Sequence, residues 1–317
     1  MKIDLHIHTK TGSDGALSVR EVLEEAKKRG IDLISITDHD SLDAHEEAVA
    51  YAPKLGMAYL TGIELNVTFR HPESAKDVSL DFLGYGFDLN NSELKNKLQV
   101  IKEHREKRAR QILNNLNAEF TKEGIARFTE EDLEKIQESV DGVFGRPHIA
   151  TYLIKKGIVK TIQEAFDKYL VKCDAPKYPL SLAEASGLIR GAGGILVHAH
   201  PNDPNGTSLA TITEDFEEQA KIIEEYMLEC IDGIECWHPR HSQRTTEYYV
   251  QFARKHNMIV TGGSDCHQRP IVVGTLDIPD WVAEQFKNMI IHRNVLDECS
   301  AGDFLNEGLR DKRPIVG

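Results

Sequence analysis

The chain has 317 residues, of which 40% are hydrophobic and 28% are charged, a balance typical of a soluble globular protein with a substantial core. Its formal net charge of −13 argues against long duplex nucleic acid as a partner, because neutralising phosphates needs clustered Lys and Arg. No run approaches the roughly 20 apolar residues of a membrane-spanning helix, so no membrane partner is expected.

The cysteine pattern and the first residues predict where the protein works. The five cysteines are scattered, without a close Cys-x-x-Cys pair, which favours reduced thiols over a disulfide framework. The opening MKIDLHIHT carries charges and histidines where a signal peptide has an apolar core. We therefore expect a cytoplasmic protein.

Strands and helices alternate at the start of the chain. Apolar residues alternate with Asp4, His6 and His8, which indicates a strand with both histidines on one face. Ser18 is a candidate N-cap and Gly30 a C-terminal stop for the first helix. We expect strands at 3–9, 31–40 and 57–69 and helices at 18–30 and 41–56. Such alternation predicts a parallel sheet, open or closed into a barrel.

The middle of the chain differs from its two ends. Charged, amphipathic segments predict helices within 91–120, 129–140, 146–157 and 161–172, with no convincing strand before residue 180. Alternation then returns, with helices at 182–193, 215–230 and 244–257 and strands at 194–201, 233–239 and 258–267. We interpret residues 1–90 and 180–300 as one α/β unit, 91–179 as a helical insertion and 301–317 as a C-terminal tail.

Potential metal ligands stand at the ends of the predicted strands. They are His6, His8, His39, Glu64, His200, His238, Asp265 and His267. Because the carboxyl ends of parallel strands share one rim, we expect these side chains to lie together. Asp14, which precedes Gly15, is either a turn residue or a ligand from the neighbouring loop.

The recurrence of the candidates favours metal binding. A single histidine at a strand end is more often a structural residue, but the i, i+2 spacing occurs twice, at His6/His8 and at Asp265/His267. Imidazole with carboxylate and no thiolate suits Mn, Zn or Fe. Eight or nine ligands exceed the needs of one ion, so we expect two or three, with Glu64 as a bridge. Adjacent ions clamp phosphoryl groups, which predicts hydrolysis of a phosphate ester.

The motifs resemble a known family. DLHIHT, SDG, TDHD, GIE, AHP and GSDCH, in this order, resemble the PHP (polymerase and histidinol phosphatase) superfamily of metal-dependent phosphoesterases. DFLGYGFD, GRPHIA, EAFDKYL and GIECWHPRHS are similar to its TrpH-type branch, which includes nucleoside 3',5'-bisphosphate phosphatases and exoribonucleases. The resemblance implies an α/β fold, a distorted seven-stranded β/α (TIM-like) barrel with a helical insertion domain covering the active-site rim.

The resemblance also implies a trinuclear metal site. It assigns His6, His8, Glu64 and Asp265 to the first ion. Glu64 and His200 would bind the second ion, and Asp14, His39 and His267 the third. A hydroxide bridging two ions would attack phosphorus, so no side-chain nucleophile is implied.

One position departs from the family pattern. Asp81 stands where the family commonly has a histidine ligand of the second ion. We expect Asp81 to bind that ion, with His71 as an alternative ligand. Aspartate is shorter and negatively charged, so the second ion would be weakly held or replaced.

Two further motifs supply candidate phosphate contacts. Arg146 and His148 lie at a predicted helix start, where free N–H groups and the arginine fork favour phosphate. Arg146 could instead lock the insertion to the barrel. Arg240 and His241 are the candidates in HPRHS, and His241 either contacts phosphate or gives a proton to the leaving oxygen. With Asp265 and Glu64, we expect His241 to be catalytic.

Other polar residues receive supporting roles. His238 would be structural or close to the ions, and His198 would be buried and hydrogen-bonded. Asp38 and Asp40 would orient ligands or the leaving group. The basic segment 102–110 would be a solvated helix face whose cationic side helps to admit an anionic substrate.

These observations predict an enzyme that hydrolyses a phosphate monoester of a small phosphorylated metabolite or nucleotide. A phosphodiesterase or 5'-to-3' exonuclease on short RNA or DNA ends is the alternative within the same class. A metal-binding module without turnover is a second alternative, and the Asp81 departure gives it some weight. Amide hydrolysis would use similar ligands, but GRPHIA and HPRHS suit phosphate better than a carbonyl group.

Overall fold

The β-strands form two sheets. The computed structural model describes residues 1–71, 77–138, 144–204 and 206–290. The first sheet is parallel and contains β1 (Ile3–Asp4), β2 (Leu33–Ile34) and β3 (Ala58–Tyr59) in that order. The second sheet contains β4 (Gly62–Phe69), β5 (Val78–Tyr85), β6 (Ile195–His198), β7 (Gly233–Trp237) and β8 (Ile259–Gly262) in that order. In it β5 runs antiparallel to both neighbours, whereas β6, β7 and β8 are parallel.

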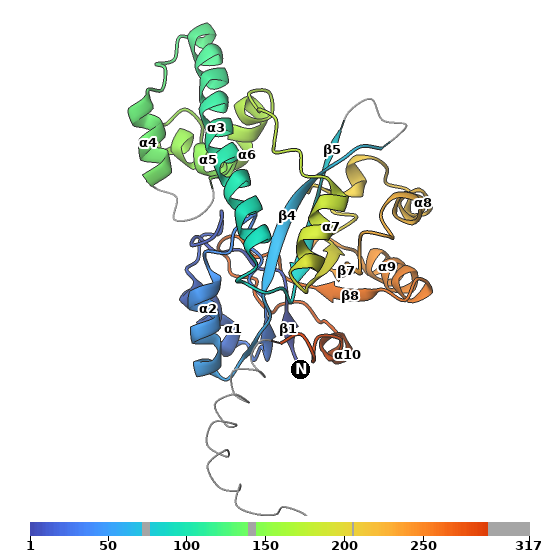
Figure 1. Cartoon of the computed structure of the whole chain (residues 1–317). Coiled ribbons are helices and arrows are strands. Elements are labelled where there is room, and N and C mark those ends of the chain that lie inside the picture. Colours follow the sequence, from blue (N-terminus) through green and yellow to red (C-terminus); the bar gives the residue numbers. More distant parts are fainter. Residues whose placement is uncertain (72–76, 139–143, 205, 291–317) are drawn as a thin grey trace, which may run out of the picture.

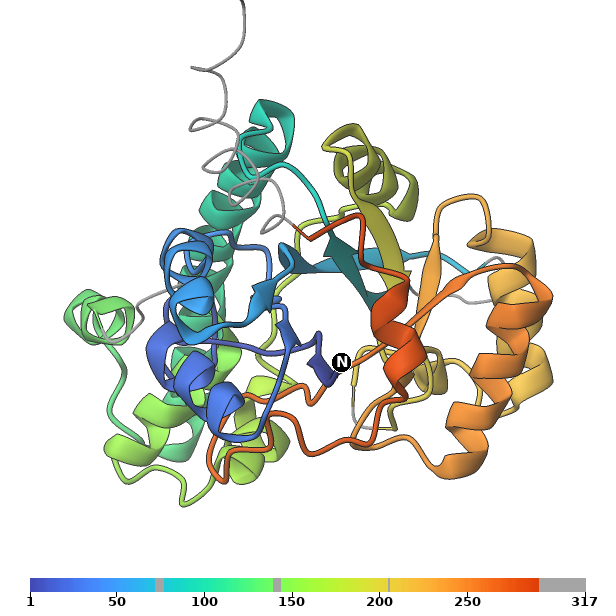
Figure 2. The same ribbon diagram turned by 90° about the horizontal axis from the view of Figure 1, so that it is seen from below.

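Backbone contacts join the edges of the two sheets. Ile7 forms a bridge with Cys266 beyond β8, and His39 forms one with Glu64 in β4. Figure 2 shows the strands around a common centre, with α1 and α2 in blue on one side and α8 and α9 in orange on the other. The α/β class is therefore as expected, but one seven-stranded barrel is not confirmed, since the described residues contain eight strands in two sheets.

The first strands are much shorter than the sequence predicts. Side-chain oxygens of Asp4, Thr37 and Asp38 accept hydrogen bonds from the N–H groups of His6, Ile7 and Thr9, at 3.4, 3.2 and 2.6 Å. In a β-sheet these N–H groups would donate to the neighbouring strand. Because they donate to side chains instead, the regular strand ends before them. The chain beyond β1 is thus irregular where it presents His6 and His8.

Helices cover the outside of the strands. Ser18 caps α1 as predicted: its Oγ accepts from the N–H of Glu21, whose carboxylate accepts from the N–H of Ser18. Gly30, just beyond α1, has a φ of 73°, a left-handed conformation that suits a helix stop. The helices and turns outside the insertion are α1 (Val19–Lys28), α2 (His45–Tyr51), η1 (Ala52–Leu55), α7 (Leu182–Gly191), η3 (Leu209–Thr211), α8 (Phe216–Tyr226), α9 (Gln243–Lys255) and α10 (Asp280–Glu284).

The middle of the chain is helical, as predicted. Its elements are α3 (Ser92–Glu123), α4 (Glu130–Glu138), α5 (Arg146–Lys155), α6 (Ile162–Ala165) and the π-helical turn η2 (Phe166–Leu170). They share a hydrophobic cluster, which includes Leu116, Phe120 and Tyr169 and is separate from the cluster around the strands. Figure 1 shows α4, α5 and α6 at the end of the molecule away from the N-terminus. A division into domains stays a prediction, and the predicted tail at 301–317 lies outside the described residues.

Among the described helices, none is both long enough and apolar enough to cross a lipid bilayer. The buried side chains gather instead between the strands and the helices, where Leu5, Ile63, Phe82 and Val197 are fully enclosed. Burial of such side chains is the main favourable contribution to folding.

His45 joins α2 to the strands in its neutral form. Its Nε2 donates to the Gly62 carbonyl at 2.7 Å, and the Tyr59 hydroxyl donates to its Nδ1 at 2.8 Å. Burial lowers the pKa of His45 to about 4, so the folded protein takes up this proton far less readily than the unfolded chain.

We expect His45 to make the fold sensitive to acid. Between pH 6.5 and about pH 4 the histidine is protonated in the unfolded chain but not in the folded protein. The free energy of unfolding therefore falls by about 1.4 kcal/mol for each pH unit in this range. Urea unfolding of EDTA-treated protein at pH 7 and pH 5 measures this loss. H45Q, whose amide can still donate to the Gly62 carbonyl, should lose less stability; an equal loss in both proteins would contradict the assignment.

Candidate metal centre

Four predicted ligands converge at the first cluster. The Nε2 atoms of His6 and His8 lie 3.1 Å apart. Glu64 Oε2 lies 3.5 Å from His6 Nε2 and 3.2 Å from His8 Nε2, while Asp265 Oδ1 lies 3.3 and 3.4 Å from them. All four side chains are buried or nearly so. The structure thus brings together the set that the resemblance assigns to one ion.

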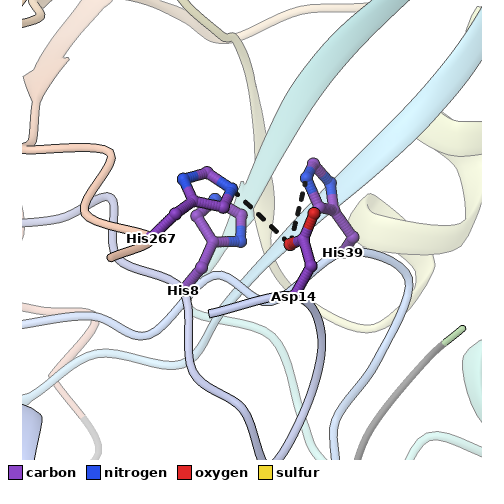
Figure 3. Close-up of side chains that lie close together, drawn as sticks. All are labelled: His8, Asp14, His39 and His267. Carbon is purple, nitrogen blue, oxygen red and sulfur yellow. Dashed lines mark ion pairs between the residues drawn. The ribbon is translucent and has the colours of Figure 1, made fainter. Parts of the chain in front are cut away.

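A second group of ligands adjoins the first. Figure 3 shows Asp14 between His39 and His267, with His8 stacked on His267 at a centroid distance of 4.0 Å. Asp14 Oδ1 lies 3.6 Å from His267 Nε2 and 4.0 Å from His39 Nε2. Asp14 therefore reaches from its loop to the histidines, as a ligand would. The sequence did not predict that His8 also belongs to this group.

The third cluster contains Glu64, Asp81 and His200. His200 Nε2 lies 3.2 Å from Glu64 Oε1. Asp81 lies in β5 directly opposite Asn66 of β4, whose side-chain amide donates to Asp81 Oδ1. Asp81 thus sits within a strand and beside Glu64, not at a strand end as the other candidates were expected to be.

His71, the alternative to Asp81, lies elsewhere. Its ring packs beside Phe69 and Tyr226 at centroid distances of 6.4 and 5.8 Å. It belongs to none of the three ligand clusters found among the described residues. The geometry therefore favours Asp81 as the third member of this cluster.

Two carboxylate oxygens of the ligand clusters are buried without a hydrogen-bond partner in the described structure. Glu64 Oε2 is buried and forms no hydrogen bond within the described structure, although His39 Nδ1 lies 3.0 Å away. Asp14 Oδ1 is similarly unsatisfied there. Unpaired buried oxygens are costly, and a cation would satisfy them. Imidazole and carboxylate donors in this mixture fit Mn, Zn or Fe.

The backbone is strained at two of the ligands. Asp265 has a φ of 47° and His200 a φ of 25°, in a region that residues other than glycine rarely adopt. Such strain persists only where the surroundings impose it, and it concentrates at functional sites. In these conformations His200 pairs with Glu64 at 3.2 Å, and Asp265 pairs with His6 at 3.3 Å.

Burial and neighbouring charges shift the pKa values of several candidate ligands, including His8 and Asp81. Burial alone would lower the pKa of His8, but the carboxylates of Asp265 and Glu64 beside its Nε2 raise the pKa to about 10. Burial and the negative charge of Glu64 raise the pKa of Asp81 to about 7. The carboxylates thus crowd one another, while the imidazoles supply the balancing positive charge. A divalent cation would displace those protons and relieve the crowding.

Glu235 supports the ligands and was missed by the sequence analysis. It lies fully buried in β7, with Oε1 3.0 Å from His6 Nδ1, and its Oε2 accepts from the N–H of His200 at 2.8 Å. A carboxylate on Nδ1 fixes the ring so that Nε2 faces the cluster. The available signal was a single acid in the otherwise apolar strand GIECW.

Asp38 and Asp40 hold different parts of the rim. Asp38 accepts from the Ser13 hydroxyl at 2.7 Å, and Ser13 Oγ lies 3.4 Å from His8 Nδ1. Asp38 therefore reaches a ligand through Ser13, in the supporting place expected for it. Asp40 instead pairs with Arg105 of α3. Arg105 belongs to segment 102–110, so the interpretation of that segment as a solvated face is wrong at this residue, which is only 19% exposed.

The candidates at the start of α5 differ in their positions. Arg146 Nη1 pairs with Asp174 Oδ2 at 2.6 Å, and its guanidinium lies over the Phe166 ring. This ion pair stays within the helical segment, so it does not lock that segment to the barrel. His148 accepts from the N–H of Gly145 at 3.0 Å. Its ring is close enough to Asp14 for the two charges to interact.

Arg240 and His238 both contact the ligand Asp265. Arg240 Nη2 lies 3.2 Å from Asp265 Oδ2, and the same guanidinium pairs with Asp203. His238 Nε2 also lies 3.2 Å from Asp265 Oδ2. His238 is therefore adjacent to the ligands, which was one of the two positions expected for it.

The hydrogen bonding of His241 and His198 differs from what the sequence predicts. His241 Nδ1 donates to the Cys236 carbonyl at 3.0 Å, and burial lowers its pKa to about 4. Its Nε2 then carries a lone pair that can accept a hydrogen bond, and the neutral ring has no proton at this nitrogen to give to a leaving oxygen. His198 is buried as predicted, but it stacks on Phe82, and neither of its ring nitrogens hydrogen-bonds within the described structure.

The fold and the ligand clusters together define a metal-dependent phosphoesterase. Residues 4–180 match the family model of the PHP domain, and the chain belongs to this family. It is 33% identical to the 3',5'-nucleoside bisphosphate phosphatase of Chromobacterium violaceum over 272 residues, which cover 84% of this chain and 87% of that protein. It is 28% identical to a 5'-3' exoribonuclease of Haemophilus influenzae, covering 84% of this chain and 90% of that protein.

A solved structure shares the fold of this chain. An amidohydrolase from Chromobacterium violaceum, with bound sulfate and no metal, superposes with a TM-score of 0.75 at 30% identity. The match covers 92% of this chain and 98% of that one. It therefore includes the helical segment as well as both sheets.

We expect Asp265 to be required for metal binding. D265N should lose at least one ion per chain and reduce phosphoester turnover by at least about a hundredfold, because the ligand oxygen becomes a neutral amide. Asparagine tolerates the left-handed φ of 47° at this position, so the fold should persist. Metal content by mass spectrometry and circular dichroism measure both effects. D43N, at a half-exposed carboxylate away from the ligands, is the control; full metal content in D265N would contradict the site.

Glu235 gives a separate expectation. E235Q should weaken metal binding by about 10- to 100-fold, because the amide orients the His6 ring less firmly than the carboxylate does. Competition with a chelator at fixed pH measures the affinity. If the affinity stays unchanged, the contact of Glu235 with His6 at 3.0 Å has no influence on metal binding.

Proposed function

We propose that this chain hydrolyses a phosphate monoester of a small phosphorylated metabolite or nucleotide, such as a nucleoside 3',5'-bisphosphate. The observation that carries the proposal is the group of three adjoining ligand clusters, two of which share Glu64 and two of which share His8. Similarity to a bisphosphate phosphatase over 84% of this chain supports it. The substrate would be a small anion. The net charge of −13 argues against a long nucleic acid, which needs clustered Lys and Arg.

The residues fit two or three divalent ions of Mn, Zn or Fe. His6, His8, Glu64 and Asp265 would hold one, and Asp14, His39 and His267 another. Glu64, Asp81 and His200 would hold a third. Ions bound in this way lower the pKa of water and polarise phosphoryl oxygens, which is the chemistry the reaction needs.

The remaining side chains would bind and orient the substrate. Arg240 lies beside Asp265 and can turn its free donors to a phosphate. His148 is near enough to Asp14 for the Asp14 charge to raise its pKa against the lowering effect of burial, and it would contact a phosphate at that cluster. Arg146, the first residue of the same helix, is paired with Asp174. His241, kept neutral by burial, would accept a hydrogen bond from the substrate at its Nε2.

Cleavage at the 5' end of a short RNA is the second candidate. It is favoured by 28% identity to an exoribonuclease over 84% of this chain. It is also favoured by Arg105, which the helical segment brings into an ion pair with Asp40 near the ligand clusters, because a phosphodiester chain needs cations beyond the reacting phosphate.

One comparison of substrates tests the proposal. The Mn²⁺-loaded protein is given adenosine 3',5'-bisphosphate or a 5'-phosphorylated RNA tetranucleotide at equal concentration, with D265N as the background control. We expect phosphate release from the bisphosphate to be the faster reaction. Cleavage of the RNA alone would make the chain a nuclease. Turnover of neither substrate with Mn²⁺, Zn²⁺ or Fe²⁺ would instead favour a metal-binding module without activity.

A further inference from the structure

Asp203 is a fully buried acid that the sequence analysis did not single out. It follows β6, shortly after the ligand His200, and belongs to none of the ligand clusters found in the described part of the chain. Arg240 meets it with two hydrogen bonds, from Nε to Oδ1 at 2.7 Å and from Nη2 to Oδ2 at 2.5 Å. A buried carboxylate destabilises the fold unless a cation pairs with it, and this two-bond fork is a strong form of such pairing.

The loop after β6 fixes the position of Asp203. Its N–H donates to the His200 carbonyl at 3.0 Å, and the buried Ser208 hydroxyl donates to its carbonyl at 2.6 Å. A Cβ atom on Gly206 would lie 2.4 Å from Asp203 Oδ2, so only glycine lets the backbone approach the carboxylate this closely. Asp203 is therefore held in place relative to the ligand His200.

Arg240 also reaches the ligand Asp265. Its Nη2 lies 3.2 Å from Asp265 Oδ2, and His238 Nε2 lies 3.2 Å from the same oxygen. His238 Nδ1 accepts from the N–H of Arg240 at 3.3 Å, so the proton of the neutral ring is on Nε2 and points to Asp265. Two donors from the segment after β7 thus converge on this one oxygen.

The two oxygens of Asp265 therefore face different partners. Oδ1 lies 3.3 and 3.4 Å from Nε2 of His6 and of His8, on the side of the ligand nitrogens. Oδ2 is turned to the two donors instead. A carboxylate whose outer oxygen is hydrogen-bonded presents its other oxygen to an ion in a fixed direction.

Arg240 depends on Asp203 for its contact with Asp265. The Arg240 side chain is 43% exposed, and an exposed guanidinium beside a single carboxylate gains little from that contact and loses rotamer freedom in making it. Its positive charge would also repel ions bound at Asp265. Asp203 removes both difficulties, because it anchors the guanidinium from a fully buried position and neutralises its charge.

We propose that Asp203 is a positioning residue of the metal centre: through Arg240 it holds Asp265 with Oδ1 toward the ions. It contacts neither ions nor substrate and takes no part in bond cleavage. The proposal rests on the ligand clusters of the proposed function, but it holds for any phosphoester substrate. The bonds to the two carboxylates use Nε and Nη2 of Arg240, so the phosphate contact proposed above would fall to Nη1.

Three variants and one control test the proposal. D203N keeps the size of the side chain but leaves only one oxygen to accept from Arg240, R240M removes the guanidinium, and D203N/R240M removes both partners. D232N is the matched control, because Nε and Nη2 of the 40% exposed Arg190 contact Asp232 at 3.3 and 2.9 Å. Asp232 precedes β7 whereas His238 follows it, so the control lies at the end of that strand away from the ligands.

Competition with a chelator at fixed pH measures the Mn²⁺ affinity of the full chain. We expect D203N to bind Mn²⁺ about 10- to 100-fold more weakly than the wild-type protein, and D232N to bind it as the wild-type protein does. In the R240M background, D203N should change the affinity by less than about twofold, because Asp203 acts only through the guanidinium. A merely structural role would lower the affinity in both backgrounds.

Circular dichroism and urea unfolding without metal check that each variant folds. R240M leaves Asp203 buried without a cation, which is strongly destabilising. If R240M does not fold, D203N/R240M, in which this carboxylate is neutral, is compared with D203N, and we expect their affinities to agree within about twofold.

Two results would overturn the proposal and leave the proposed function in place. One is a wild-type affinity in D203N. The other is a cost of the second substitution, in R240M or in D203N, as large as the cost of D203N in the wild-type protein. If the wild-type protein binds Mn²⁺ but cleaves no phosphoester, the proposed function fails, and the affinities still decide the role of Asp203.

Discussion

The buried carboxylate of Glu64 is the constraint on which the site depends. Its two oxygens lie within 3.5 Å of nitrogen atoms of His6, His8, His39 and His200, and it is only 1% exposed. A desolvated charge of this kind is stable only among compensating positive charges. The histidines that follow strands of both sheets therefore converge on Glu64 in β4. The backbone bridge between His39 and Glu64 holds His39 in this position. The contact that joins the sheets is thus also a contact between ligands.

The helical segment changes the character of the rim. The two sheets and the loops that follow their strands contribute carboxylates and imidazoles. By contrast, α3 and the chain after η2 contribute Arg105, Arg108 and Lys177. Opposite charges meet at Asp40 and near Asp81. The candidate ligands thus lie on and next to the strands, whereas these cations come from the helical segment and the chain that follows it.

Much of the ligand set could be predicted from short local patterns. The i, i+2 spacing of His6 and His8 needs only an extended backbone to put both on one face, and this holds although β1 itself has just two residues. Glu235 and Arg105 were missed because their partners are distant in the chain: His6 lies 229 residues from Glu235, and Asp40 lies 65 from Arg105. Patterns within one element carry no information about such pairs.

The sequence by itself determined the family, the alternation of strands and helices, and most of the residues that form the ligand clusters, because these follow from local periodicity and from motifs of fixed spacing. Only the tertiary structure decided that Asp81 and not His71 lies beside Glu64, since this depends on the antiparallel register that sets Asn66 opposite Asp81. It alone also decided that His8 serves two clusters. Each of these depends on the packing of segments that are remote in the chain, and sequence spacing does not encode that packing.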